Sequence, residues 1–229
     1  MKTFREGKKM FERKTAKLNE RNRQILVEEK KRCGIMGKRF RLLFWTSIIS
    51  VASTAMTIVN SLCIKNEDLV LPLLAVGTIA SIFSIIILFM LGKYNANFTA
   101  AAVICIMTQI SSVFEEMSTG EVNTVLLFFT VFLSIVFVSK YSTGMEESCM
   151  PADEYLAGSW ASYRKAYVVI SIGKLCCVMA AYTPILAFLA VIASVLFAIA
   201  AIVVDIIQLN LLHRSPKTMA AYSQAPVLG

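Results

Sequence analysis

The sequence predicts an all-α, polytopic membrane protein with six transmembrane helices, both termini in the cytoplasm and a basic N-terminal cytoplasmic helix. Two observations lead to this fold class. Hydrophobic residues make up 57% of the 229-residue chain and charged residues 17%, whereas soluble domains average about 45–50% and about 25%. The charges are also unevenly placed, because residues 1–41 hold 15 of the 23 lysines and arginines.

The six helices are placed by apolar runs long enough to cross about 30 Å of hydrocarbon. Four runs are separate, at about 42–64, 69–92, 98–114 and 123–139. The fifth, 166–212, is too long for one crossing and contains Tyr182-Thr183-Pro184. Because the residue before a proline is biased away from helix, we expect two spans there, about 166–183 and 185–209, which form an antiparallel hairpin. The transmembrane domain then covers 42–212.

The flanking charges orient these spans. With the N-terminus inside, the cytoplasmic segments are 1–41, 93–97, the loop 140–165 and the tail 213–229, and together they carry 21 lysines and arginines. The outer segments carry one, Lys65, against five acidic residues. This is the asymmetry of the positive-inside rule. The first 41 residues show no signal-peptide pattern, so the first span is expected to direct insertion into the cell (plasma or inner) membrane.

Two cytoplasmic segments are expected to meet partners. The basic arm, residues 1–41, is predicted to be a charged helix up to about Arg32 that is either solvated or rests on anionic lipid headgroups. Basic arms next to membranes are ordinary, so a nucleic-acid partner is not expected. The loop 140–165 carries four acids and ends in aromatic and basic residues typical of a membrane interface.

Lys174 and Asp205 are the charges well inside the last apolar run. At 1.5 Å per residue, a straight hairpin separates their levels by about 18 Å. Asp205 is therefore expected level with Arg164 and Lys165, in an interfacial charge cluster. Lys174 is left near the midplane, where a charge faces the bundle interior or a wet cavity, unless its stem snorkels to the cytoplasmic headgroups.

Polar side chains at middle depth in the other spans are predicted to line a cavity with Lys174. Gln109 and Thr130 are the predicted binding residues beside it. The remaining members of this polar set are Ser53, Thr54, Ser81, Ser84 and Thr108. The alternative is hydrogen bonding between helices, worth only about 0.6 kcal/mol on average.

Small residues form a stripe along the last span, at Ala187, Ala190, Ser194, Ala198 and Ala201. Such a stripe lets a second helix approach closely. It predicts a packing seam within the bundle first, and a homodimer face through Ala190, Ser194 and Ala198 second. Gly77 and Ser81 form a shorter version on the second span.

The cysteines and the histidine predict no metal site. None of the six cysteines is in a CxxC pair, and the one histidine, His213, stands at the end of the last apolar run. Metal sites need several ligands, and no cofactor motif accompanies these residues. We therefore expect no disulfide framework, no metal and no cofactor.

Two short cytoplasmic stretches, "GKYNANF" at 92–98 and "MPADEY" at 150–155, are arranged as in a known family. Their layout resembles the accessory-gene-regulator B family, six-helix membrane cysteine peptidases that process signalling peptides. The matching residues are Gly92, Tyr94 and Pro151-Ala152-Asp153.

The catalytic positions of that family are not matched. Asn95 stands where the family has its histidine, and Ala102 where it has its cysteine, with Cys105 the nearest thiol. A cysteine nucleophile needs a base to hold it as thiolate, and an asparagine amide cannot take that proton. The resemblance therefore implies a divergent relative without peptidase activity by that pair.

Three function classes follow from these features. The first is a non-enzymatic protein for transport or for binding a small molecule or peptide, suggested by Lys174 among polar residues. The second is a divergent, inactive relative of the peptidases, and the third is a membrane scaffold that uses the arm or the loop 140–165. The sequence holds no phosphate-binding loop, HExxH or GxSxG motif, which argues against an ATPase, zinc protease or serine hydrolase.

Overall fold

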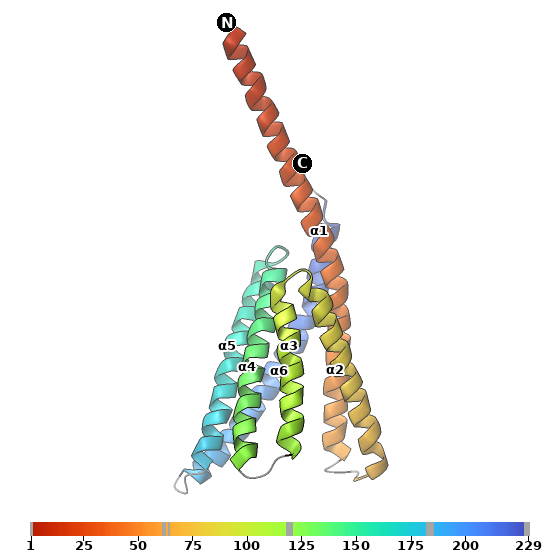
Figure 1. Ribbon diagram of the computed structural model, residues 1–229, viewed down its shortest axis with the longest axis vertical. Coiled ribbons are helices and arrows are strands. Elements are labelled where there is room, and N and C mark those ends of the chain that lie inside the picture. Colours follow the sequence, from red (N-terminus) through yellow and green to blue (C-terminus); the bar gives the residue numbers. More distant parts are fainter. Residues whose placement is uncertain (1, 61–62, 64, 118–120, 182–185, 227–229) are drawn as a thin grey trace.

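The predicted all-α class is confirmed by the structure, a computed structural model that describes residues 2–60, 63, 65–117, 121–181 and 186–226 (Figure 1). The helices are α1 (Lys2–Val59), α2 (Val70–Gly92), α3 (Ala96–Met117), α4 (Glu121–Cys149), α5 (Glu154–Ala181) and α6 (Ala187–Gln224), with a short 3-10 helix η2 (Glu67–Leu69) before α2. The joint expected at Tyr182-Thr183-Pro184 lies outside the described residues.

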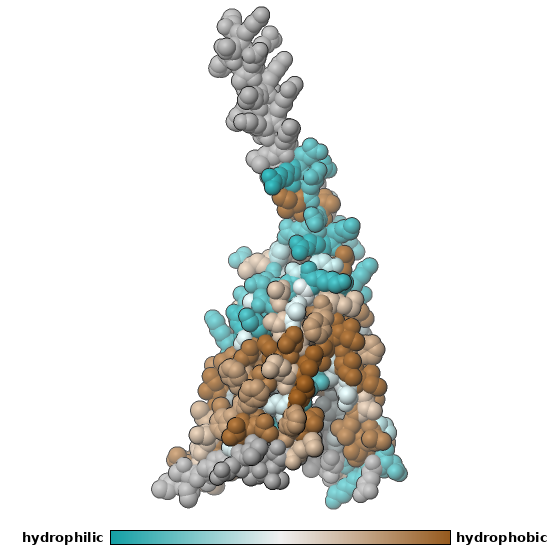
Figure 2. All heavy atoms as spheres, viewed as in Figure 1, coloured by the Kyte–Doolittle hydropathy of each residue, from teal (hydrophilic) through white to brown (hydrophobic). Residues whose placement is uncertain are grey.

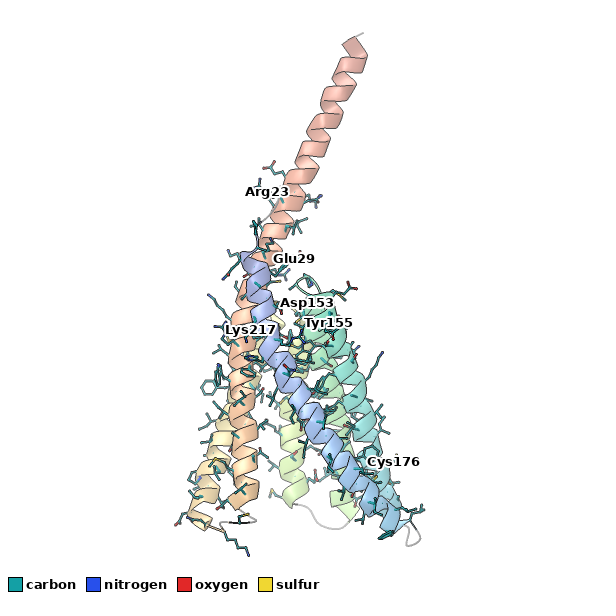
Figure 3. All side chains as sticks on the ribbon, turned by 180° about the vertical axis from the view of Figure 1, so that it is seen from behind. Arg23, Glu29, Asp153, Tyr155, Cys176 and Lys217 are labelled. Carbon is teal, nitrogen blue, oxygen red and sulfur yellow. The ribbon has the colours of Figure 1, made fainter. Side chains whose placement is uncertain are left out.

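The six helices form a closed ring. Each packs against its neighbours in the chain, and α6 also packs along α1, which closes the circle. The end of α6 lies beside α1, where Lys30 donates to the Ala225 carbonyl at 2.8 Å, and α1 extends beyond it toward the N-terminus (Figure 1). α6 runs obliquely across the bundle toward α1, as the view from behind shows (Figure 3).

Five helices are long and apolar enough to cross a membrane, within α1, α2, α3, α4 and α6. The described part of α5 is not among them; it carries Arg164, Lys165 and Lys174, and its apolar run continues past Ala181, beyond the described residues. Large apolar side chains such as Leu71, Met117 and Phe188 are more than 70% exposed on the outside of the ring. Water does not favour so much exposed apolar surface, whereas a bilayer does. Figure 2 shows this surface as a brown band, here called the apolar band.

A polar head caps the apolar band at the end where the termini lie (Figure 2). It consists of residues 20–41 of α1, the α2–α3 and α4–α5 turns with the adjoining helix ends, and residues 210–226. The predicted loop 140–165 is corrected here, because α4 continues to Cys149 and α5 starts at Glu154. The predicted tail 213–229 is likewise helical through Gln224. Hydropathy changes at the membrane surface, but a helical backbone satisfies its own hydrogen bonds and continues into water.

Most of the tightly packed core lies toward the head rather than in the middle of the band. Its largest fully buried side chains include Trp160, Phe40, Phe98 and Met145. They bring α5, α1, α3 and α4 together in one apolar cluster. Phe98 lies edge-on to Phe40, with ring centroids 5.8 Å apart. The head thus holds the ring together, and the band beneath it is packed less densely.

Small residues allow close approach at two seams. A Cβ on Gly77 would lie 3.3 Å from the Ser53 hydroxyl oxygen, so α2 approaches α1 closely there. A Cβ on Gly173 would overlap the Phe197 ring at 2.3 Å, which sets the register of α5 on α6. The expected stripe on α6 does not form one seam: Ala190 is buried, while Ser194 and Ala198 are exposed.

Candidate functional site

A cavity of about 290 Å³ lies inside the ring, in the half of the apolar band nearer the head. We call it the central cavity. Five helices line it: α1 with Leu43, Ser47, Ser50 and Val51; α2 with Ser81, Ser84 and Leu88; α3 with Cys105 and Gln109; α4 with Phe137 and Tyr141; and α6 with Asp205, Gln208 and Leu209.

The lining of the central cavity includes several polar residues within the apolar band, although most of its surface is apolar. Four serines, two glutamines and one tyrosine line it, and Asp205 is the one charged residue among the described lining. Some of these groups already form hydrogen bonds within the protein: the Ser84 hydroxyl donates to Thr46 Oγ1 at 2.9 Å. Burying polar groups costs free energy unless they find partners. The lining therefore suits a polar solute or ordered water better than lipid.

Tyr141 marks the wall toward the head. Its side chain is 3% exposed, and no described group forms a hydrogen bond with its hydroxyl within normal geometry. The Gln208 amide lies near it but does not meet that geometry. Buried hydroxyls usually have a partner, but this oxygen has almost no accessible surface, so a solute in the cavity would meet other atoms of Tyr141 rather than its hydroxyl.

Lys174 lines a second, smaller cavity of about 120 Å³ between α5 and α6, here called the side cavity. Asp205 lines the same space and also borders the central cavity. The hairpin arithmetic that set the two residues about 18 Å apart in level is thus corrected. Gly173 packs on Phe197, and Asp205 follows Phe197 by eight residues, which places the two levels about 12 Å apart.

Side-chain direction closes most of that remaining gap. A helical side chain points toward the N-terminus of its own helix. Since α5 and α6 are antiparallel, Lys174 and Asp205 point toward one another along the seam. The lysine stem has four flexible carbons, and Lys174 is the charged group that acts on Asp205 electrostatically. No ion pair within 4.0 Å joins these two described residues.

The expected cluster of Asp205, Arg164 and Lys165 is not brought together. Arg164 instead pairs with Glu146, Nη1 to Oε2 at 3.0 Å, and donates to the Thr143 hydroxyl at 2.5 Å. This happens because α4 continues as a helix past residue 140, so both partners lie opposite Arg164 on the neighbouring helix. Lys165 is exposed.

The other predicted polar residues divide between the central cavity and the helix seams. Gln109, Ser81 and Ser84 line the cavity. Thr130 does not, because its hydroxyl lies 2.7 Å from that of Ser111 across the α3–α4 seam. Ser53 donates to the Leu73 carbonyl on α2. Thr54 and Thr108 bond to their own helices.

A separate cleft of about 380 Å³ lies in the polar head, between the arm and the two turns that carry the peptidase-like motifs. We call it the head cleft. Glu147 accepts hydrogen bonds from Asn95 at 2.8 Å and Asn97 at 3.0 Å. Arg32 and Arg39 both lie over the Tyr94 ring. Tyr94 and Asn95, from the predicted motif, therefore bind the head together through polar contacts.

The thiols of the polar head, outside the membrane-spanning segments, are not activated. Burial raises the pKa of the Cys33 thiol, with a further rise from the Glu29 carboxylate. Burial likewise raises the pKa of Cys149, to about 12. Cys105 follows Asn95 by ten residues along α3, about 15 Å of helix, so the two cannot form a catalytic pair. Among the described residues, no group of three His, Cys, Asp or Glu side chains forms a metal site.

Comparison with protein-family models, with curated proteins and with solved structures finds no match for this chain. The resemblance to the accessory-gene-regulator B family stays a prediction. Function is therefore argued from the cavities alone.

Sequence reasoning missed several residues of the central cavity, above all Gln208 and Tyr141. A signal for Gln208 was present, since it follows Asp205 by three residues and so shares its helix face. Tyr141 was assigned to a loop, because the charged Lys140 before it ended the apolar run. Ser47 and Ser50 lie near the start of the first span and gave no comparable signal.

Proposed function

We propose that this chain is a non-enzymatic membrane protein that binds, and in the membrane transports, a small polar solute in the central cavity. The observation that carries the proposal is the lining itself: five helices direct hydroxyls, amides and one carboxylate into one space inside the apolar band. The chemistry needed is recognition rather than bond breaking, since the described lining pairs no nucleophile with a positioned base.

The proposal includes six crossings with the head in the cytoplasm, in the cell membrane. The described part of α5 does not qualify as a membrane span by itself, but α5 runs beside α4 along the bundle (Figure 1). Lys174, the charged residue in the apolar run of α5, lines the side cavity. The head carries most of the basic residues, as the positive-inside rule requires of a cytoplasmic surface.

Thiol labelling of intact cells tests this orientation. Cys63, which is exposed between α1 and η2, is kept as the single cysteine in one variant, and Lys217→Cys in the head is the single cysteine in another (Figure 3). We expect an impermeant maleimide to label Cys63 on intact cells and to label the Lys217→Cys variant only after permeabilisation. The reverse labelling pattern would mean that the head lies outside the cell. Labelling of both sites without permeabilisation would contradict the proposed orientation.

Solute binding is tested with three probes of similar size: propane-1,3-diol, n-butylammonium and butyrate. At least one should raise the melting temperature of the protein in mild detergent in a saturable way. Ser50→Leu, which fills the central cavity, should abolish that rise. Ser194→Leu makes the same change on the outer surface of α6 and should leave it intact. No saturable effect from any probe, or equal effects in both variants, would contradict the proposal.

The basic arm supports a narrower lipid contact than the whole of residues 1–41. α1 continues unbroken away from the bundle (Figure 1), so its first half leaves the bilayer. Headgroup contact is proposed for the basic residues nearest the apolar band, Lys38, Arg39 and Arg41. A homodimer through Ala190, Ser194 and Ala198 stays a prediction.

A scaffold role in the polar head is the second candidate. The head cleft favours it, because charged residues of the arm and the α4 end border the same open space. Deleting residues 2–19, which lie outside that cleft, should not affect a partner bound there.

A further inference from the structure

Asp205 faces two spaces at once. It is the one charged residue of the described lining of the central cavity, and it also borders the side cavity that holds Lys174. Neither arginine nor lysine lines the central cavity. A carboxylate within an apolar band needs a positive partner nearby. For Asp205 this partner is Lys174, which lines the side cavity and not the central cavity.

The contact between Lys174 and Asp205 is loose. The two groups share a cavity of about 120 Å³ but form no ion pair within 4.0 Å. Lys174 is exposed, and its flexible stem can withdraw along the seam. Asp205 can thus exchange one positive partner for another without the backbone moving.

We propose that the solute of the central cavity is a small primary ammonium ion, and that Lys174 is a tethered counter-ion which this cation displaces from Asp205. This inference rests on the proposed function. An ammonium group carries three donors and no acceptor. The carboxylate, the serine hydroxyls and the glutamine carbonyls of the lining supply acceptors, and about 290 Å³ leaves room for a short carbon chain. An anion would meet hydroxyl and amide donors there, but the negative charge of Asp205 would repel it.

Three charge variants of the purified full-length protein test this, with n-butylammonium as the probe and its affinity read from the concentration dependence of the melting temperature. Lys174→Gln should tighten binding by roughly tenfold, because the competing charge is gone. Lys174→Arg keeps the charge and should bind like the wild type. Asp205→Asn should weaken binding by at least roughly tenfold. Butyrate should not bind to the wild type or to either Lys174 variant, which keep the Asp205 carboxylate.

Each other outcome overturns the inference in a distinct way. If propane-1,3-diol binds as well as n-butylammonium, the cavity is a site for neutral solutes and the proposed function stands alone. If Asp205→Asn weakens binding but Lys174→Gln does not tighten it, Lys174 is no competitor. If no probe binds, the proposed function fails as well. Should Lys174→Gln not fold, Lys174→Met, which keeps the length of the stem, provides the same comparison.

Discussion

Trp160→Ala should lower the free energy of unfolding by about 3–5 kcal/mol, the usual cost of emptying a buried tryptophan site. Trp160 is 0% exposed. It lies edge-on to Tyr141 and Tyr163, with ring centroids 5.7 Å and 5.6 Å away. Its indole N–H donates to the Ser215 hydroxyl at 3.2 Å. The residue thus joins α5 to α4 and α6 in the head, and titration with sodium dodecyl sulfate in mixed micelles would measure the loss.

Trp45→Ala is the matched control for this prediction. Trp45 is 56% exposed on the outside of the ring, so the same truncation should cost under about 1 kcal/mol. Equal losses in the two variants would show that the head does not hold the bundle together.

Tyr141→Phe should stabilise the fold without weakening solute binding. In the protein without solute it removes a buried hydroxyl that has no partner, which should stabilise the fold by about 1 kcal/mol. Because that hydroxyl has almost no accessible surface in the central cavity, the affinity for n-butylammonium should stay within about twofold of the wild type. The melting temperature with and without n-butylammonium measures both effects in one experiment.

Tyr163→Phe is the matched control for this prediction. Tyr163 is equally buried, at 3% exposed, and its hydroxyl also lacks a partner. It does not line the central cavity. We expect the same gain in stability with unchanged affinity for the probe. A loss of affinity in Tyr141→Phe alone would contradict the burial of its hydroxyl away from the solute.

The sequence alone was sufficient for the all-α class and for helices that are long and apolar enough to cross a membrane, because both follow from the length and composition of the apolar runs. It could not place helix ends, since a helix such as α4 continues into water as far as Cys149. It also misjudged the relation of Lys174 to Asp205. Their level depends on how Gly173 packs against Phe197, and helix packing of this kind cannot be read from residue counts.

The central cavity was only partly predictable. Gln109 and two serines line the central cavity, but Lys174, which was predicted to share a cavity with them, lines the side cavity instead. Thr130 was expected there too, but it faces Ser111 instead. Whether a polar side chain faces the cavity or a neighbouring helix depends on its position within one turn of the helix. Because the spans are apolar on all sides, the sequence does not show which face points into the cavity.

Two native cysteines allow the most direct test of the central claim. Cys105 lines the central cavity, whereas Cys176 is exposed on α5 within the apolar run (Figure 3). Each is kept as the single cysteine in proteoliposomes and treated with a membrane-impermeant, trimethylammonium-bearing methanethiosulfonate. We predict that Cys105 reacts and Cys176, covered by lipid, does not. An inert Cys105, or a Cys176 that reacts as fast, would contradict a water-accessible polar cavity inside a membrane-embedded ring.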